Sequence, residues 1–387
     1  MDATHLVWDA KGGVKARVQA TYGLLETPSS AIVYAVNEFI WRTSAKLSRG
    51  LLEGRMNISA IIPLYNGGKY IRGALDSVLR QDRPADEIIV VDDGSTDDGP
   101  LVVAEMAARH PSIQLVSKPN GGQSSARNFG VRHSKGDLIA LLDQDDEWYP
   151  HHLRILEQPF KETRSIPLGW AYSNLDHIDV LGRMMTRSVL DTVPNTEHPK
   201  RDVLKCLGRD MFVLPGASII SRSAFDSVAG FDEQFVGYED DDLFLRLFVA
   251  GFDNVYINEP LTKWRMHSTS TSFSEKMARS RALYFEKLRR NFPDEPNMAR
   301  FYVRDHVAPR FTKTAMVELI SAITRMDRAA AKRSAEQIRY FAKELPARRR
   351  LPVVMVSHVL ATSVMQAVYR SAPKRLVRVA RRAIGVA

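Results

Sequence analysis

The chain has 387 residues, of which 44% are hydrophobic and 26% are charged. These values are ordinary for a globular protein, and the length favours one large domain with appended parts. The single cysteine, Cys206, excludes an internal disulfide and a four-thiolate metal site. We therefore expect a reducing, cytoplasmic location.

The net charge of +9 belongs to the C-terminal tail. Residues 340–387 contain ten Lys and Arg against one acid, Glu344, so the other 339 residues carry no net charge. A basic excess confined to a tail says little about the chemistry of the rest of the chain, and we expect no nucleic-acid partner.

The first part of the chain, residues 1–55, has helical rather than strand character and is predicted to be a helical extension. It contains no basic run leading into an unbroken apolar stretch, so the sequence predicts no signal peptide. Met56 directly precedes the first strong strand, and a start of the chain at this methionine is an alternative.

From Asn57 onward, short apolar runs alternate with amphipathic stretches. Strands are predicted at Ile58–Pro63, Glu87–Asp92, Ile113–Ser117 and Leu138–Leu142, with helices at Lys69–Arg80, Leu101–His110 and Ser124–His133. This alternation predicts an α/β fold with a mainly parallel sheet flanked by helices. Runs such as IIVVDD are apolar on both faces, as buried parallel strands are.

Polar clusters follow the ends of these strands. They are Tyr65 with Asn66, Asp92 with Asp93, residues 120–122 and residues 143–146. In an open α/β sheet the ligand lies outside the carboxyl ends of the strands, so we expect these clusters to converge on one crevice.

After Pro150 the sequence becomes less regular. The stretch Asp176–His198 is predicted to be loop and hairpin, and a second ordered block runs from Gly216 to Leu247. From about Ser274 the sequence is helical and basic to its end.

The sequence DQDD, Asp143 to Asp146, directly follows the strand LIALL. Three carboxylates in four residues repel one another unless a cation neutralises them, and hard oxygen ligands suit Mg²⁺ or Mn²⁺. Asp145 and Asp146 are therefore candidate metal ligands. The alternative is an acidic N-cap of the helix that begins near Pro150.

Two further acidic clusters carry possible chemistry. In VVDDGSTDDGP, residues 90–100, a strand-end carboxylate could accept the imide N–H of uracil, although an Asx turn would explain the same residues. In YEDDD, Glu239 and Asp240 lie at the predicted N-terminus of a helix, where a carboxylate could take a proton from a hydroxyl. Ordinary helix capping is the alternative for this second cluster.

The sequence KWRMHSTSTS begins at Lys263. Trp264 could provide a face on which a sugar stacks, and Arg265 or His267 could contact a phosphate or the metal. A structural role for the histidine is the alternative reading.

Together these motifs resemble family 2 glycosyltransferases with the GT-A fold. The segments IIPLYNGGKYIRGALDSVLRQ, EIIVVDDGSTDDG, KPNGGQSSARNFGVRHSKGDLIALLDQDDEWYP, GYEDDDLFLRL and WRMHSTS occur in the family's order over about residues 57–270. The resemblance implies a catalytic domain at 56–275, with a nucleotide-sugar-binding half at 56–150 and an acceptor half at 151–275. Residues 276–387 would form a helical, basic C-terminal region.

The resemblance also assigns roles to individual residues. Pro63 and Tyr65 would border the base pocket, and Asp93 with Asp92 would recognise uracil. Gly122, Arg127 and Asn128 would help to shape the donor site. Asp143 and Asp145 would form the DXD pair, with Asp145 and Asp146 the expected contacts to ribose and metal. Asp240 would be the general base, supported by Glu239.

The implied reaction moves a sugar from a nucleotide-diphosphate donor, with UDP the expected nucleotide, to a carbohydrate or lipid-linked acceptor. A divalent Mn²⁺ or Mg²⁺ would assist, and single displacement would invert the anomeric centre. Asp241 stands where the family often has an aromatic residue, which leaves open which of Asp240, Asp241 and Asp242 faces the acceptor. A sugar-phosphate nucleotidyltransferase and a non-catalytic nucleotide-sugar-binding protein are the alternatives.

The tail suggests a second kind of partner. Lys374–Val386 reads as a basic amphipathic helix, which suits the face of an anionic membrane at the cytoplasmic leaflet. A solvated basic helix packed on the catalytic domain is the alternative. Leu351–Val368 is apolar but interrupted by polar residues, which is poor for spanning a bilayer.

Overall fold

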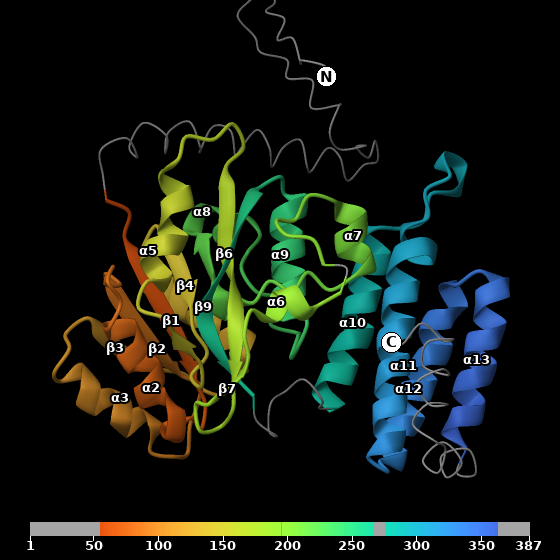
Figure 1. Ribbon diagram of the computed structural model, residues 1–387, viewed down its shortest axis with the longest axis horizontal. Helices are drawn as coiled ribbons and strands as arrows, with labels where there is room; N and C mark the ends of the chain where they lie inside the picture. The colour runs from red at the N-terminus through yellow and green to blue at the C-terminus, as the bar shows by residue number, and fades with distance from the viewer. Residues whose placement is uncertain (1–54, 195, 267–274, 363–387) are drawn as a thin grey trace, which may run out of the picture. The chain divides into compact units, whose positions relative to one another are not determined.

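The computed structural model describes residues 55–194, 196–266 and 275–362 (Figure 1). All of these belong to a compact unit that begins at Arg55. The helical extension predicted before Arg55, the candidate ligand His267 and the basic helix predicted at 374–386 lie outside the described residues.

The first half of the unit alternates strands and helices as the sequence predicts. Its elements are β1 Ile58–Leu64, α2 Gly68–Leu79, β2 Glu87–Asp92, α3 Gly99–Ala107, β3 Ile113–Ser117, α4 Gln123–His133 and β4 Leu138–Leu141. The pairs β3–β2, β2–β1 and β1–β4 are all parallel. The four predicted strands are confirmed to within one residue at each end.

The second half of the unit extends the same sheet with mostly antiparallel pairs. Its elements are β5 Glu147–Trp148, α5 His152–Glu157, a 3₁₀ helix Gln158–Lys161, β6 Leu168–Ile178, β7 Met184–Thr186, α6 Val189–Thr192, α7 Val203–Gly208, a 3₁₀ helix Pro215–Ala217, β8 Ser218–Ser221, α8 Arg222–Ser227, α9 Glu239–Val249 and β9 Asp253–Arg265. The strand order is β3-β2-β1-β4-β8-β6-β9-β5, with β7 paired to β6. The strand β8 runs antiparallel to β4 and β6, whereas β6 and β9 are parallel.

The predicted hairpin within 176–198 is confirmed as β6 and β7. Its turn is closed by the Asp179 carboxylate, which accepts the backbone N–H groups of Leu181 and Arg183, each at 2.9 Å. Gly182 lies in this turn with φ of +79°, a conformation that glycine adopts without the steric cost of a side chain.

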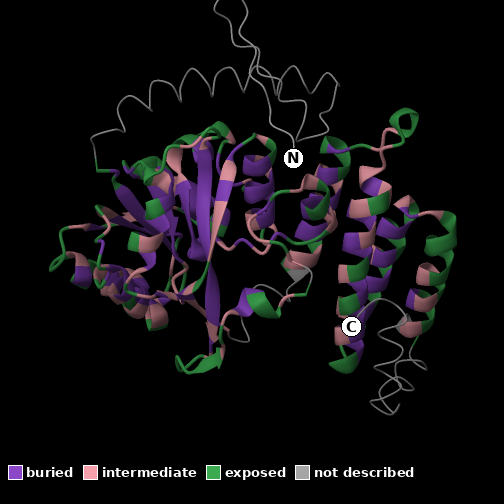
Figure 2. Ribbon diagram, turned by 45° about the horizontal axis from the view of Figure 1, so that its top comes forward, coloured by how far each residue is buried: buried purple, intermediate pink, exposed green. Residues whose placement is uncertain are grey.

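Both faces of the parallel sheet are covered by helices. Ile88 and Val90 of β2 pack in the cluster that contains α2 and α3, whereas Ile89 and Val91 pack against Ala126 of α4. Successive residues of a strand point to opposite faces of the sheet. The unbroken apolar run of β2 is therefore buried on both faces. Figure 2 shows the resulting buried strands between their helices.

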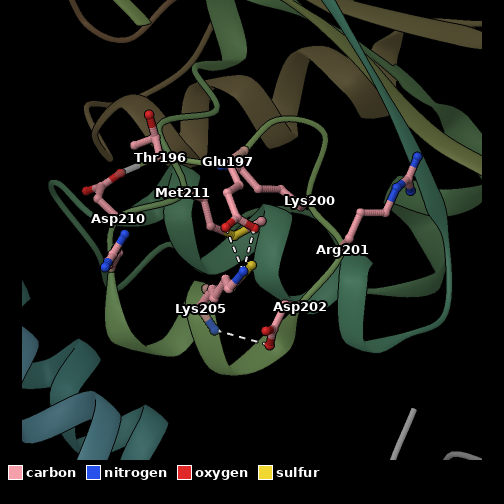
Figure 3. A pocket seen from close by; sticks show the side chains of 10 residues that line it. Thr196, Glu197, Lys200, Arg201, Asp202, Lys205, Asp210 and Met211 are labelled. Atoms are coloured by element: carbon pink, nitrogen blue, oxygen red, sulfur yellow. Dashed lines mark hydrogen bonds and ion pairs between the residues drawn. The ribbon is translucent and has the colours of Figure 1, made fainter. Parts of the chain in front are cut away.

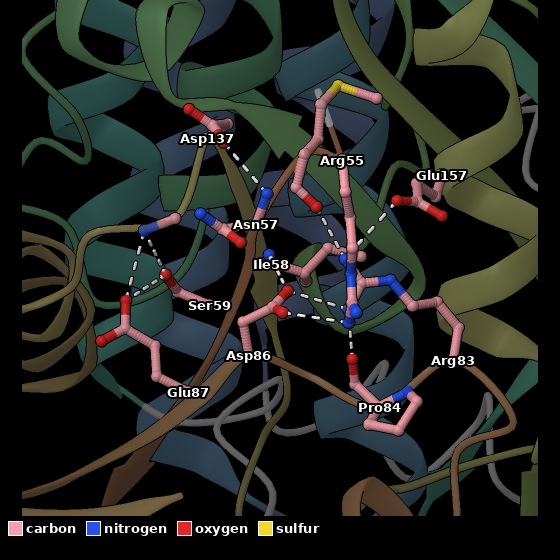
Figure 4. A network of polar contacts seen from close by, with 12 residues as sticks. Arg55, Asn57, Ile58, Ser59, Arg83, Pro84, Asp86, Glu87, Asp137 and Glu157 are labelled. Carbon is pink, nitrogen blue, oxygen red and sulfur yellow. Dashed lines mark hydrogen bonds and ion pairs between the residues drawn. The ribbon is translucent and has the colours of Figure 1, made fainter. Parts of the chain in front are cut away.

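Polar side chains fix the amino ends of the strands (Figure 4). The Arg83 guanidinium donates to the Met56 carbonyl at 2.7 Å and to Asp86 Oδ2 at 2.8 Å, and Asp86 Oδ2 also accepts the Ile58 N–H at 2.8 Å. Asp137 Oδ2 accepts the N–H of Asn57 at 2.9 Å. This network fastens the start of β1 at the sheet edge opposite the predicted crevice.

The C-terminal region is helical, as predicted, over its described residues. It comprises α10 Glu275–Asn291, a 3₁₀ helix Pro296–Met298, a π-helical turn Val303–Val307, α11 Ala308–Thr324, α12 Arg328–Phe341, a 3₁₀ helix Ala342–Glu344 and α13 Ala347–Ala361. The buried rings of Phe285, Phe311 and Phe341 contact one another, with centroids 4.8 to 5.6 Å apart. Over the described residues, no helix is both long and apolar enough to cross a bilayer.

Candidate active site

The loops after β1 and β4 are joined by one side chain, Gln144 of the DQDD motif. Its amide oxygen accepts the Tyr65 N–H at 2.8 Å, and its amide nitrogen donates to the Tyr65 carbonyl at 3.1 Å. Gly67 lies so close that an added Cβ would be 2.3 Å from Gln144 Oε1. Pro63 is buried in β1, whereas the ring of Tyr65 is half exposed. The sequence motifs therefore meet at the carboxyl edge of the sheet, as expected.

The two acids at the end of β2 make different contacts. Asp93 is buried, and its carboxylate accepts Lys118 Nζ at 2.6 Å and the N–H groups of Gly121 and Gly122 at 2.9 and 2.7 Å. Asp92 accepts the Ser95 N–H at 2.9 Å. Asp93 thus fastens the glycine loop that precedes α4, and Gly122 in that loop has φ of +87°.

The buried guanidinium of Arg127 links two motifs that are over ninety residues apart in sequence. From α4, its Nη2 lies 2.6 Å from Asp143 Oδ1, and its Nη1 lies 3.3 Å from Glu239 Oε1 at the start of α9. Burial alone lowers the pKa of Arg127, but the charges of Asp143 and Glu239 outweigh burial and raise it. The arginine therefore stays charged and holds the DQDD loop against α9.

Arg265 fastens the DQDD loop from the other side. Its backbone N–H donates to Asp146 Oδ1 at 2.8 Å, and its guanidinium donates to Asp145 O at 2.7 Å, Glu147 Oε1 at 2.7 Å and Asp179 O at 3.1 Å. Each guanidinium nitrogen has a protein acceptor. The sequence suggests a phosphate contact for this arginine, which stays a prediction; within the described residues its guanidinium supports the acidic loop.

The acidic loop is crowded with negative charge. Asp146 is buried, and burial together with the charges of Asp145 and Asp143 raises its pKa well above the usual range. Asp143 and Asp145 are partly exposed at the mouth of the sheet. Oxygen ligands in this arrangement fit a hard divalent cation. Across the described residues, however, no three acidic, histidine or cysteine side chains form a complete metal cage. The set is partial, and other ligands would be needed to complete it.

The three aspartates at the start of α9 differ in their partners. Asp241 accepts Met211 N–H, the Tyr284 hydroxyl and Arg310 Nη2, each at 2.8 Å. Asp242 accepts Arg246 Nε at 2.8 Å and is paired with Lys287 Nζ at 2.6 Å. Both carboxylates are buried and their oxygens are used.

Asp240 differs from its two neighbours because it is partly exposed. Its Oδ1 accepts the N–H of Asp241 at 2.7 Å. Burial and the charges of Glu239, Asp210 and Asp241 raise the pKa of Asp240 well above the usual range. Glu239 is buried and accepts the Gly237 N–H at 2.7 Å in addition to Arg127. A carboxylate with a raised pKa and partial exposure is the one in this motif suited to accept a proton.

Two other predicted residues contribute to packing. Asn128 uses its whole side-chain amide on the loop before α9, donating to Phe231 O at 2.8 Å and Glu233 Oε1 at 2.9 Å and accepting Phe231 N–H at 2.9 Å. Trp264 packs beside Leu175 and Val189, and His177 meets its ring edge-on at a centroid distance of 4.8 Å. Asn128 therefore shapes the site by holding the loop before α9, because its side-chain amide is already used by Phe231 and Glu233.

A small cavity lies beside Asp210, between the segment 196–206 and Met211 (Figure 3). Charged side chains line it, and Lys205 Nζ pairs there with the Glu197 carboxylate at 2.6 Å. Its volume of about 20 Å³ admits only a water-sized group.

Four residues of the site were not predicted from the sequence: Gln144, Lys118, Tyr284 and Arg310. Gln144 stands inside the DQDD motif, so its position was a usable signal. Lys118 immediately precedes the PNGG segment, but nothing in its spacing predicts a pair with Asp93. Tyr284 and Arg310 lie beyond every motif and reach α9 only through the packing of α10 and α11.

We predict that Arg265→Met destabilises the protein by about 2 to 4 kcal/mol, because three buried or half-buried acceptors lose their donor. Urea unfolding checks this value. Lys263→Met is the matched control, since Lys263 also pairs with Glu147 at 3.1 Å but is more exposed, and it should cost less than about 1 kcal/mol. Wild-type stability of Arg265→Met combined with lost nucleotide binding would restore the phosphate role.

Comparisons with known proteins agree with this geometry. Residues 59–228 match the model of Glycosyl transferase family 2, and residues 209–270 match that of the N-terminal domain of galactosyltransferase. An uncharacterized glycosyltransferase of Rickettsia bellii is 32% identical over 221 residues, which is 56% of this chain and 30% of that protein. A chondroitin synthase of Escherichia coli is 27% identical over 237 residues, which is 61% of this chain and 33% of that protein. The chain thus spans about a third of the length of these two relatives.

Solved structures support the fold. Residues 1–349 of Staphylococcus aureus TarS, in complex with UDP-GlcNAc, superpose with a TM-score of 0.56 at 19% identity, covering 81% of this chain and 90% of that one. Identity this low bears on the fold alone. Residues 59–228 therefore form a glycosyltransferase family 2 domain, and the described residues have the GT-A fold.

Proposed function

We propose that the chain transfers a sugar from a nucleotide-diphosphate sugar, with UDP as its nucleotide, to a hydroxyl of an acceptor. One observation carries this proposal: Arg127 links Asp143, at the donor end of the site, to Glu239 beside the candidate base Asp240. A donor bound at the DQDD loop would present its anomeric carbon toward α9. The complex of TarS with UDP-GlcNAc gives a precedent for the donor class within this fold.

The alternative of a sugar-phosphate nucleotidyltransferase has weaker support. Such an enzyme needs free backbone N–H groups and basic residues after β1 to bind a triphosphate. Here the N–H of Gly68 already donates to Asp97 Oδ2 at 2.8 Å, and that of Asn66 donates to Ser95 Oγ at 3.1 Å. A non-catalytic binding protein would not need an acid with a raised pKa at α9.

For the donor, we assign the base contact to Asp92 and to the exposed ring of Tyr65. The Asp93 carboxylate is occupied by Lys118 and two glycine N–H groups, so it supports the pocket from behind. Asp143 lies at the same edge, where it would meet the ribose. Asp145 and Asp146, with His267 beyond the described residues, would bind Mn²⁺ or Mg²⁺.

For the transfer step, we assign the general base to Asp240. The acceptor hydroxyl gives its proton to the Asp240 carboxylate while its oxygen bonds to the anomeric carbon. The bond from that carbon to the diphosphate breaks on the opposite face, so the configuration inverts. A bound divalent metal supplies charge neutralisation at the departing diphosphate. Glu239 and Arg127 keep the start of α9 in place during this step.

For the acceptor, we propose a polysaccharide or lipid-linked carbohydrate presented at the cytoplasmic face of a membrane. Leu351, Met355 and Val359 form an exposed apolar stripe on α13, at helical spacing. Arg348, Arg349 and Arg350 are exposed at the start of the same helix. An apolar stripe next to basic residues suits an anionic bilayer surface, and the basic segment 374–386 would add to it.

We predict that UDP with MnCl₂ raises the melting temperature of the wild-type protein, and that EDTA or Asp145→Ala removes the increase. A ligand at one hundred times its dissociation constant stabilises the folded state by about 2.7 kcal/mol. Thermal unfolding measures the effect. Glu105→Ala, which removes an exposed acid of α3, is the control and should behave like the wild type. An increase that survives both EDTA and Asp145→Ala would contradict the metal role.

We predict that Asp240→Asn lowers UDP release from UDP-sugars by about 10²- to 10⁴-fold while UDP binding stays within twofold, because the base acts on the acceptor. Steady-state assays over a panel of UDP-sugars with MnCl₂ measure turnover. Asp242→Asn is the matched control. It should lower the free energy of unfolding and leave turnover per folded molecule largely unchanged. Pyrophosphate release from UTP and a sugar phosphate, in place of UDP release, would favour the nucleotidyltransferase.

We predict that the full chain floats with anionic vesicles and not with neutral ones, since each basic residue near such a surface contributes about 1 kcal/mol. Replacing Leu351 and Met355, which are 62% and 67% exposed, by Gln should weaken flotation. The control replaces Leu181 and Met185, which are 72% and 63% exposed on the β6–β7 hairpin, by Gln. A chain truncated before Arg348 that floats as well as the full chain would rule out this surface.

A further inference from the structure

Three segments distant in sequence converge on the first turn of α9 and on its carboxylate at Asp241. Met211, in the loop after α7, donates its N–H to Oδ1, while Tyr284 of α10 and Arg310 of α11 donate to Oδ2, each at 2.8 Å. Figure 1 shows α9 lying between the sheet and the helices α10 and α11. The start of α9 is thus fixed by α10, by α11 and by the loop after α7.

Arg310 is the cation of this cluster. Its side chain is 6% exposed, and its Nη1 donates to the Cys206 carbonyl at 3.2 Å, while Nη2 also lies 3.9 Å from Asp210 Oδ2. Its guanidinium lies over the rings of Tyr284 and Phe311. Burial alone lowers the pKa of Arg310, but the charges of Asp241, Tyr284 and Asp210 outweigh burial and raise it. Arg310 is therefore a permanent positive charge beneath the acids.

Asp240 stands in the middle of these groups. Glu239 and Asp241 flank it on α9, and the charge of Asp210, in the loop after α7, also helps to raise the pKa of Asp240. Two buried arginines offset the four acids: Arg127 of α4 pairs with Glu239, and Arg310 of α11 pairs with Asp241 and lies near Asp210. Removing either cation would leave a buried carboxylate unpaired, which is strongly unfavourable.

We propose that Arg310 is a positioning residue for transfer: through Asp241 and Asp210 it fixes the orientation and the ionised state of the Asp240 carboxylate. The C-terminal helices would then contribute to turnover as well as to the stability of the fold. This inference rests on the proposed role of Asp240 as the base. It goes beyond that role because it makes turnover depend on α11, outside every family motif of the sequence.

The test compares Arg310→Met and Arg310→Lys with a matched control, Lys287→Met. Lys287 also reaches α9 from the C-terminal helices, but it pairs with Asp242 at 2.6 Å and with Asp232 at 2.7 Å, away from Asp240. Each variant is assayed for UDP release from UDP-sugars with MnCl₂ across pH, for UDP binding, and for the folded fraction by urea unfolding. Tyr284→Phe, which removes one hydrogen bond to Asp241, is included in case Arg310→Met does not fold.

We expect Arg310→Met to lower kcat at neutral pH by at least about 10-fold more than Lys287→Met, per folded molecule, with UDP binding within twofold. Loss of a cation disfavours the charged carboxylate, so the pKa of Asp240 rises and the acid limb of the pH profile moves to higher pH. Arg310→Lys should recover part of kcat, and Tyr284→Phe should lower it by about 2- to 5-fold.

A wild-type kcat and pH profile in Arg310→Met would overturn the inference. If Arg310→Met does not fold, a wild-type kcat and pH profile in Tyr284→Phe would overturn it instead, as would equal losses per folded molecule in Arg310→Met and Lys287→Met. If Asp240→Asn itself keeps full turnover, the proposed base is wrong, and this result separates a failure of the proposed function from a failure of the role of Arg310.

Discussion

A single buried arginine, Arg127, connects the two acidic centres on which the site depends. A charge without water must be paired, and Arg127 has Asp143 on one side and Glu239 on the other. The pairing brings the loop after β4 and the N-terminus of α9 to opposite ends of one guanidinium. Arg127 therefore couples the proposed donor site to the proposed base, and direct displacement between two bound substrates requires such a fixed geometry.

The remaining charges follow from the same constraint. Acids outnumber cations at two places, the DQDD loop and the start of α9, and in each place burial and neighbouring carboxylates raise the pKa of one aspartate, Asp146 or Asp240. The protein supplies a second layer of cations behind these acids, Arg265 at the first place and Arg310 at the second. The excess of negative charge at the surface of the DQDD loop suits a metal ion. The excess at the start of α9 suits a proton. The proposed donor would bring the metal ion, and the hydroxyl of the proposed acceptor would bring the proton.

Sequence patterns predicted the fold well where the signal was local. The strands of the parallel half and the hairpin within 176–198 are set by apolar runs and turn residues, and all were found near their expected positions. The antiparallel pairing of β8 with β4 and β6 was not predicted, because pairing between strands some fifty to eighty residues apart leaves no local pattern.

The sequence predicted which residue types gather at this edge of the sheet, but not the contacts that each of them makes. The choice among Asp240, Asp241 and Asp242 depends on partners in α7, α10 and α11, which no motif contains. Arg265 looked like a phosphate ligand because it follows a strand near acids, yet its guanidinium is fully engaged by Asp145, Glu147 and Asp179. Asp93 looked like a base-recognising acid, and its use by Lys118 and two glycines depends on the fold of the loop.

Anomalous diffraction from crystals grown with UDP and MnCl₂ tests directly whether one edge of the sheet carries the donor, the metal and the base. We expect a manganese peak at the Asp145 carboxylate, with the diphosphate between this peak and the N-terminus of α9 and the uracil beside Asp92 and Tyr65. UDP bound with no manganese peak at the DQDD loop, or UDP bound at the amino ends of β1, β2 and β4, would contradict it.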